Sequence, residues 1–257
     1  MGRYTDREMM AVSAGRLIRN GDILFAGTGV AMLAATVAKR IHAPKSVVFF
    51  ETGGIDPSLD ELPMAVADSR VMSGTSMNSG LIDAFSFVGH RKLHTIAFLG
   101  AAQIDSFGNL NSTCIGNYWK PKVRFSGSGG ACDAASLASG FIVFMQHDKN
   151  KFVETLDYLT SPGWLQGGET RRNMGIVRGG PMAVVTNLGV MKFDDQTKKM
   201  YLAETYPGVT IQRIAENTGF KMDVSKAQES VPPSDEELRI LRTEVDPQRL
   251  ILGEGLG

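Results

Sequence analysis

The first fifty residues alternate between helical and strand-like hydrophobic patterns. A spacing of three and four residues is shown by Met10, Ala14, Leu17 and Ile18. It predicts a helix that begins at the capping box Thr5–Glu8 and is closed by Asn20-Gly21. A short apolar run at 23–26 then predicts a strand, and an alanine-rich stretch at 31–41 without glycine or proline predicts a second helix.

The run Val47-Val48-Phe49-Phe50 is apolar throughout, which is typical of a short strand buried on both faces of a parallel sheet. With the preceding strand and helix it makes a β-α-β unit, so the two strands are expected to be parallel, with a right-handed crossover. The tips of both strands are then predicted to lie on one edge of the sheet.

Further elements follow the same patterns. Strands are predicted at 95–99, 141–145, 183–186, 190–193 and 200–202, the last two as a hairpin. Helices are predicted at 209–218 and after a second capping box at Ser234–Glu237. We expect an α/β fold, an open and mostly parallel sheet flanked by helices, with a C-terminal hairpin. We expect one domain over 1–257, with residues 231–257 as a helical tail within it.

Composition narrows the function classes. The chain of 257 residues has 27 basic and 27 acidic side chains, so it carries no net charge that would favour nucleic acid. No stretch resembles a signal peptide or a membrane span, and Cys114 and Cys132 lack metal-site spacing. These features predict a cytoplasmic protein with reduced thiols that acts on small molecules, with no nucleic-acid or membrane partner.

Glu51 follows the predicted buried strand directly and precedes Gly53-Gly54. The C-terminal edge of an open α/β sheet is where such folds place reactive groups, and glycine lets a backbone N–H approach a ligand closely. The alternative interpretation is a solvated strand-end carboxylate beside a glycine turn.

Three other segments rich in glycine or small residues are candidate binding loops. Gly27-Thr28-Gly29 is a weak phosphate-binding signal, because it lacks the full dinucleotide fingerprint. The loop 100–113, which includes Gln103, has small and amide residues typical of binding loops. The cluster 127–133 could gather N–H donors for an anion, or could be a tight turn. His90 and His94 are interpreted as structural and not as metal ligands.

Taken in order along the chain, these segments resemble the β subunit of family I CoA-transferases, most closely the glutaconate CoA-transferase type. The resemblance rests on Gly27-Thr28-Gly29, Glu51-Thr52-Gly53 before Ile55-Asp56, the loop 100–113, the cluster 127–131, Thr160-Ser161-Pro162-Gly163-Trp164 and Glu216-Asn217-Thr218-Gly219-Phe220. Each segment alone is weak evidence for the resemblance, whereas the whole set in this order is specific for the family.

The resemblance implies roles for individual residues. Glu51 corresponds to the family's nucleophile. The oxyanion and acyl-CoA contacts are assigned to Gly53, Gly129, Gly130 and Gln103, and the CoA-binding loop to Gly27, Thr28 and Gly29. It implies no permanently bound cofactor and no metal, with coenzyme A as substrate and covalent intermediate. It also implies an α subunit as partner, in a heterotetramer or heterooctamer, and an acyl-CoA and a carboxylic acid as substrates.

Two features of the sequence leave the type of reaction open. Thr52-Gly53 stands where the family commonly has Ser-Gly or Asn-Gly, and the segment 233–239 resembles the ring-opening hydrolase branch about as well as the transferase branch. An acyl-CoA hydrolase, decarboxylase or hydratase with Glu51 as general base is therefore the alternative activity. A third class of function is a non-catalytic subunit, which would depend on its partner chain for all activity.

Overall fold

The computed structural model describes residues 4–59 and 61–253, and the chain divides into two compact units. The first unit is Met1–Phe98 with Val231–Gly257, and the second is Leu99–Ser230. The C-terminal segment thus belongs with the N-terminal part of the chain. The expectation of one domain stays a prediction, because each unit is described by itself.

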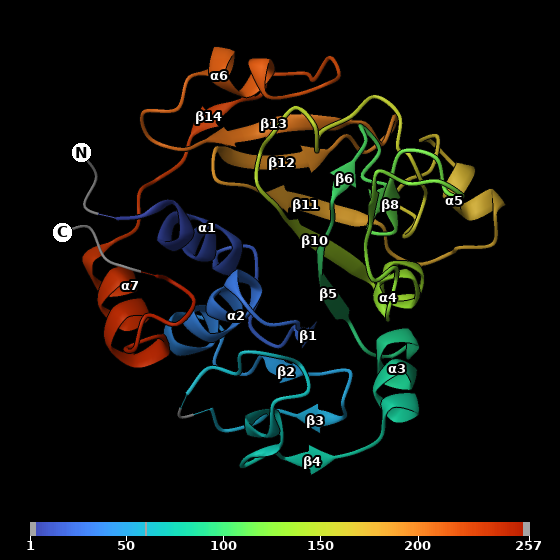
Figure 1. Cartoon of the computed structure of the whole chain (residues 1–257). Coiled ribbons are helices and arrows are strands. Elements are labelled where there is room, and N and C mark those ends of the chain that lie inside the picture. The colour runs from blue at the N-terminus through green and yellow to red at the C-terminus, as the bar shows by residue number, and fades with distance from the viewer. Residues whose placement is uncertain (1–3, 60, 254–257) are drawn as a thin grey trace. The chain divides into compact units, whose positions relative to one another are not determined.

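In the first unit, strands are ordered β5-β1-β2-β3-β4 (Figure 1). Their bounds are β1 Ile23–Phe25, β2 Val47–Phe49, β3 Gly54–Ile55, β4 Met77–Asn78 and β5 Thr95–Gly100, of which residues 99 and 100 are counted with the second unit. β1 pairs parallel with β2 and β5, whereas β3 pairs antiparallel with β2 and β4. The predicted parallel pairing of the first β-α-β unit is confirmed, and Val48, Phe49 and Phe50 are buried as expected.

The helices of this unit are α1 Asp6–Gly15, α2 Val30–Ile41, α3 Leu81–Gly89 and α7 Asp235–Ile240, with a 3₁₀ turn at Ser69–Met72 and a π-helical turn at Leu241–Val245. Both predicted capping boxes are present, at Thr5 with Glu8 and at Ser234 with Glu237. The predicted end of α1 at Asn20 is wrong, since the helix ends at Gly15. A Cβ on Gly15 would lie 3.0 Å from Cγ1 of Val37 in α2, so the helices approach closely there.

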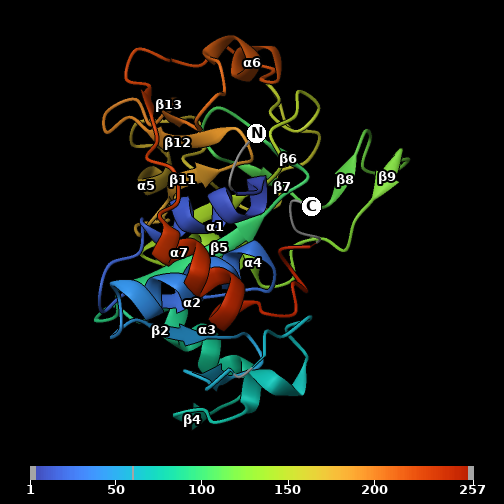
Figure 2. The ribbon, with the colours of Figure 1, turned by 90° about the vertical axis from the view of Figure 1, so that its left-hand side faces the viewer.

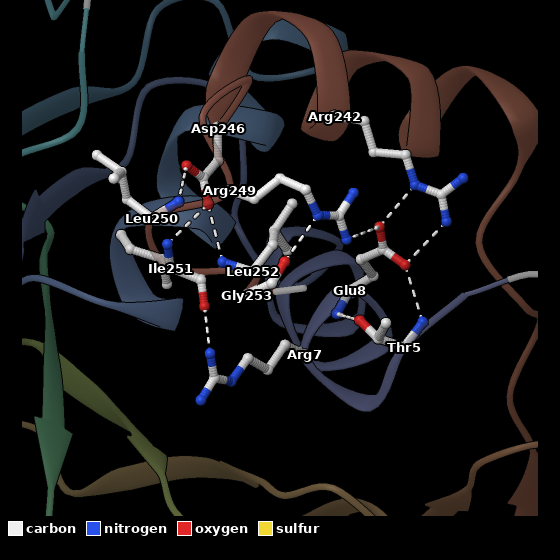
Figure 3. A network of polar contacts seen from close by, with 10 residues as sticks. All are labelled: Thr5, Arg7, Glu8, Arg242, Asp246, Arg249, Leu250, Ile251, Leu252 and Gly253. Atoms are coloured by element: carbon white, nitrogen blue, oxygen red, sulfur yellow. Dashed lines mark hydrogen bonds and ion pairs between the residues drawn. The ribbon is translucent and has the colours of Figure 1, made fainter. Parts of the chain in front are cut away.

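A polar network joins α1 to the C-terminal segment within the first unit (Figure 3). The carboxylate of Glu8 is fully buried and receives hydrogen bonds from Nε and Nη2 of Arg242 at 2.6 and 2.9 Å, and from the N–H of Thr5 at 2.8 Å. Arg16 binds Glu237 with two further hydrogen bonds, at 2.9 and 2.7 Å. The C-terminal helix is therefore fastened to the first helix by charge-assisted contacts.

The second unit has strands in the order β10-β11-β12-β13-β14, with two separate two-stranded pairs, β6-β7 and β8-β9. Their bounds are β6 Gln103–Ile104, β7 Leu110–Asn111, β8 Cys114–Ile115, β9 Val123–Arg124, β10 Gly140–Phe144, β11 Pro181–Val185, β12 Gly189–Phe193, β13 Met200–Thr205 and β14 Gln228–Glu229. The helices are α4 Ala131–Leu137, α5 Thr170–Asn173 and α6 Ile211–Glu216. β12 and β13 form the predicted antiparallel hairpin. The α/β class is confirmed, and the strand pairings are mixed.

The core of the second unit holds two buried basic side chains. His147 is stacked on Phe152, with ring centroids 4.0 Å apart, and burial lowers its pKa to about 4 against a smaller opposing effect of Asp148. Arg171 donates to the carbonyl oxygens of Pro162, Gly163, Ala135 and Arg178.

None of the helices within residues 4–59 and 61–253 has the length and apolar character of a membrane span.

Candidate active site

Glu51 lies in the tight turn that connects β2 to β3, at the C-terminal end of β2 as predicted. The turn is closed by a hydrogen bond from the N–H of Gly53 to the carbonyl of Phe50, at 3.0 Å. The side chain of Glu51 is half-buried, and within the described residues its carboxylate has no hydrogen bond or ion pair. An unengaged carboxylate at a strand end is available for chemistry.

The two glycines after Glu51 are required by close packing. A Cβ on Gly53 would lie 2.0 Å from the carbonyl oxygen of Ser79, and one on Gly54 would lie 2.1 Å from that of Val71. Ser79 also donates from its N–H and its hydroxyl to the Gly53 carbonyl, at 3.0 and 3.2 Å. The close approach expected of these glycines is therefore made by the chain's own backbone. An oxyanion role for Gly53 would require its N–H to be shared with Phe50.

The loop Gly27-Thr28-Gly29 lies beside the Glu51 turn because its strand pairs with β2. β1 and β2 are in parallel register, with Phe25 opposite Phe49, and the Ala26 N–H donates to the Phe49 carbonyl at 3.0 Å. The predicted meeting of both strand tips at one sheet edge is confirmed. Gly29 has a φ of 81° and precedes α2, and a Cβ on Gly27 or Gly29 would meet nothing within 4 Å. Unlike Gly53, these glycines leave open space next to the backbone.

The second predicted donor cluster forms a turn before α4 in the second unit. Ser128 accepts hydrogen bonds from the N–H groups of Ala131 and Cys132, both at 2.9 Å. Gly129 is exposed, with a φ of 50°, and a Cβ there would meet nothing within 4 Å. Among the residues that the structure describes, the N–H groups of Gly129 and Gly130 have no acceptor. Both N–H groups can therefore donate hydrogen bonds to a ligand oxygen.

Ser112 fixes this glycine turn, and sequence reasoning did not single it out. Its carbonyl accepts from the Gly127 N–H at 3.1 Å, and its hydroxyl donates to the Gly127 carbonyl at 3.0 Å. The Ser112 N–H in turn donates to Oγ1 of Thr160 at 2.9 Å. Thr160 begins the Thr-Ser-Pro-Gly-Trp motif, so Ser112 links the loop 100–113 to two other motifs of this unit. Only their pairing in space reveals that link.

Gln103 is buried and supports the strand end before Ser112. Its Nε2 donates to Asp157 at 2.9 Å, while its Oε1 accepts from Asn111 at 2.7 Å and from the Asp157 N–H at 3.1 Å. These contacts engage both polar atoms of the amide with protein groups. A structural role is therefore observed, and contact with acyl-CoA stays a prediction.

The predicted site residues thus form two groups. Glu51, Gly53 and the Gly27–Gly29 loop belong to the first unit, and Gln103, Gly129 and Gly130 belong to the second. A cavity of about 330 Å³ in the first unit lies beside α2 and includes the ion pair of Lys39 with Asp56, but Glu51 is not among its lining residues. Glu51 therefore lies outside that cavity.

The histidines give no sign of a metal site. His90 follows the end of α3 and His94 precedes β5, so they share no helix, and His94 Nδ1 lies 3.3 Å from Oδ1 of Asp22. Within 4–59 and 61–253, no group of three metal-ligating side chains is found. Cys114 and Cys132 are both free thiols.

The family model for coenzyme A transferase matches residues 7–217 of this chain. The chain belongs to the coenzyme A transferase family. This transferase chain is 44% identical over 253 residues to the β subunit of glutaconate CoA-transferase of Acidaminococcus fermentans, covering 95% of this chain and 93% of the relative. It is 35% identical to the β subunit of 3-oxoadipate CoA-transferase of Pseudomonas knackmussii, covering 94% of each.

The fold agrees with a solved structure of the same family. The crystal structure of glutaconate coenzyme A-transferase from Acidaminococcus fermentans matches this transferase chain with a TM-score of 0.95 and 41% identity. The match covers 98% of this chain and 99% of the other. The predicted family and α/β fold are both confirmed.

Proposed function

We propose that this chain is the β subunit of a heteromeric CoA-transferase that moves CoA from an acyl-CoA to a carboxylic acid through a thioester on Glu51. The observation that carries the proposal is the Glu51 carboxylate itself. It lies half-buried at the end of β2, and it is unengaged among the described residues.

The chemistry proceeds by acyl exchange on this carboxylate. A Glu51 oxygen attacks the thioester carbon, the carbon–sulfur bond breaks, and the CoA thiolate leaves a mixed anhydride behind. The thiolate then attacks the glutamyl carbonyl and expels the first acid as a carboxylate, which gives the enzyme–CoA thioester. The acceptor carboxylate reverses both steps and leaves as the new acyl-CoA. Every atom and electron pair is conserved without a metal or redox group.

Each step passes through a tetrahedral oxyanion that needs hydrogen-bond donors. The oxyanion role of Gly129 and Gly130 stays a prediction from the family resemblance, and within the described residues their N–H groups are not used by the turn that contains them. One such donor lowers the barrier by about 3 kcal/mol in other acyl-transfer enzymes. The Gly27–Gly29 loop, with its open backbone beside Glu51, is assigned to CoA itself.

The acceptor is proposed to be a dicarboxylic acid. The relatives named above are transferases of glutaconate and 3-oxoadipate, and each name denotes an acid with two carboxylates. Both relatives are the β subunits of their enzymes, which supports a separate α subunit here. A heterotetramer or heterooctamer remains our expectation for the assembly.

The deciding experiment traps the covalent intermediate. The two-subunit complex is incubated with acyl-CoA without acceptor. One portion is digested for mass spectrometry, and another is treated with borohydride, which reduces a glutamyl thioester to an alcohol and releases CoA. We expect a CoA adduct on Glu51 and irreversible loss of activity only after acyl-CoA treatment. Glu51→Gln is expected to abolish transfer, because an amide is a far poorer nucleophile. In Glu51→Asp the carboxylate is withdrawn by about 1 Å, which costs on the order of 10²-fold in rate.

Glu154→Gln is the matched control, because that side chain is exposed in the second unit and is expected to leave transfer unchanged. An adduct at another residue, or none while transfer proceeds, would contradict the nucleophile role. Acyl-CoA hydrolysis without CoA exchange into free acids would instead support the general-base alternative.

A further inference from the structure

The β8–β9 hairpin forms a separate two-stranded pair in the second unit. Cys114 pairs with Arg124 and Ile115 with Val123, and the strands are joined by residues 116–122. Figure 2 shows β8 and β9 extending away from β6 and β7. We call residues 114–125 the β8–β9 arm.

The arm presents aromatic and aliphatic side chains to solvent. Trp119 is 88% exposed and Tyr118 is 40% exposed. Val123 and Phe125, on the returning strand and just after it, are also exposed. Exposed apolar groups gathered on one element mark interaction sites, and Trp and Tyr are enriched among the residues that dominate binding energy. The arm therefore has the composition of an interface.

Local contacts hold the arm in one conformation. The ring of Tyr118 stacks on Tyr158, with centroids 5.2 Å apart, and the Arg124 guanidinium lies 4.6 Å from the centroid of Tyr118. Arg124 also donates to the Tyr118 carbonyl, and the Trp119 N–H donates to Oδ1 of Asn117 at 2.9 Å. These contacts fix the backbone of the turn at Trp119, and the Trp119 ring lies edge-on to that of Tyr118, with centroids 5.0 Å apart. Such preorganisation lowers the entropy cost of binding.

The charge of the arm indicates the chemistry of its partner. Lys120, Lys122 and Arg124 lie within residues 116–125, which contain no aspartate or glutamate. A complementary surface would offer an apolar pocket for Trp119 with carboxylates at its rim. Small-molecule ligands bind in concave sites that enclose them. Trp119 is exposed on a projecting hairpin, which cannot enclose such a ligand. The arm therefore fits a protein partner.

We propose that the β8–β9 arm is a docking element for the α subunit, which receives Trp119 in an acid-rimmed apolar pocket. The choice of partner follows from the relatives, which are the β subunits of two-subunit enzymes. It does not depend on the chemistry at Glu51, because assembly is measured without turnover. Failure of the covalent-intermediate experiment and failure of this proposal are thus distinguishable.

The test measures assembly of the co-purified complex over a dilution series by analytical ultracentrifugation. Trp119→Ala is expected to raise the dissociation constant by about 30-fold, as for loss of a hot-spot residue. Met174→Ala is the matched control, because that side chain is 73% exposed elsewhere in the second unit. It is expected to leave the dissociation constant unchanged. Since both side chains are exposed, neither variant should disturb folding.

A second pair of variants tests the charge. Lys120→Glu with Lys122→Glu is expected to weaken assembly by at least about tenfold at low salt, with a smaller effect at about 0.5 M salt because screening weakens the attraction between charges. Lys149→Glu, also exposed in this unit, is expected to have no effect. An unchanged dissociation constant in Trp119→Ala would overturn the proposal. So would a variant that disrupts only self-association of this chain, or one that loses CoA binding while the complex stays intact.

Discussion

At the scale of single residues, glycine serves two different purposes around the candidate site. Gly53 and Gly54 are needed because another backbone segment, at Ser79 and Val71, occupies the place of a side chain. Gly129 has open space around it, so only its backbone conformation, with a φ of 50°, favours glycine. The same residue type therefore contributes packing beside Glu51 and an exposed N–H in the second unit.

This difference predicts unequal effects of alanine. Gly53→Ala places a Cβ 2.0 Å from the Ser79 oxygen at a φ of 101°, so we expect a stability loss of about 3 kcal/mol or more and displacement of the Glu51 turn. Gly129→Ala meets no neighbour and should cost about 1 kcal/mol from backbone strain alone. Urea denaturation of both variants measures which of them loses more stability. A larger loss for Gly129→Ala would contradict this account of the turn.

At the scale of elements, buried charges fasten segments that are far apart in sequence. Arg171, in α5, is 2% exposed, and burial lowers its pKa to about 10. Its guanidinium binds carbonyl oxygens of the Pro162-Gly163 turn and of α4, so it holds the Trp164 loop in place. In the first unit, Glu8 and Arg242 fasten α1 to the segment after α7. Each network satisfies backbone or charged groups that would otherwise be buried without partners.

The Glu8 network predicts how stability depends on pH. Burial is the largest influence and raises the pKa of Glu8, but hydrogen bonds from Arg242 and Thr5 and the charges of Arg242 and Arg249 together hold it below 4.5. A carboxylate with a depressed pKa stabilises the fold above its unfolded pKa and loses that contribution as pH falls through the folded value. The contribution is therefore present above about pH 4.5 and is lost progressively below it.

Glu8→Gln is expected to lower stability by about 2 kcal/mol at pH 7, since charge-assisted hydrogen bonds are replaced by neutral ones. The difference from the parent protein should shrink as pH falls below 4.5. Urea denaturation between about pH 3.5 and 7 measures it, with the exposed Glu154→Gln as control. A difference that stays constant over this range would contradict the ion-pair account.

At the scale of the whole molecule, two segments that are far apart in the sequence make up the first unit. Residues from Val231 onward belong to the first unit, although 132 residues of the second unit, Leu99–Ser230, separate them from Phe98. Buried side chains of this segment are Leu238, Ile240, Leu241 and Val245. The unit that carries Glu51 therefore includes a segment that follows the whole second unit in the sequence.

A chain shortened to end at Ser230 tests this arrangement. Removing the segment takes away the helical turns that pack against α2 and leaves the buried Glu8 without Arg242. We expect the amides of α1 and α2 to lose hydrogen-exchange protection by at least about 10²-fold, while those of β11, β12 and β13 keep theirs. Equal loss in both units would indicate that they unfold together.

The sequence by itself determined the local elements and the chemistry of single positions. The first β-α-β unit, both capping boxes, the β12–β13 hairpin and the place of Glu51 at a strand end were predicted correctly, since apolar periodicity, caps and turn residues act over a few positions. The ordered motifs also identified the family, because their sequence order is retained whatever contacts they make.

Only the tertiary structure decided what each motif touches. The close approach at Gly15 depends on Val37 of α2, and the need for Gly53 depends on Ser79, which is 26 residues away in the chain. The hydrogen bonds of Gln103 to Asp157 and of Ser112 to Gly127 and Thr160 likewise join distant segments. A pattern read along the chain contains no information about such pairings, because they form only when separate elements pack against each other.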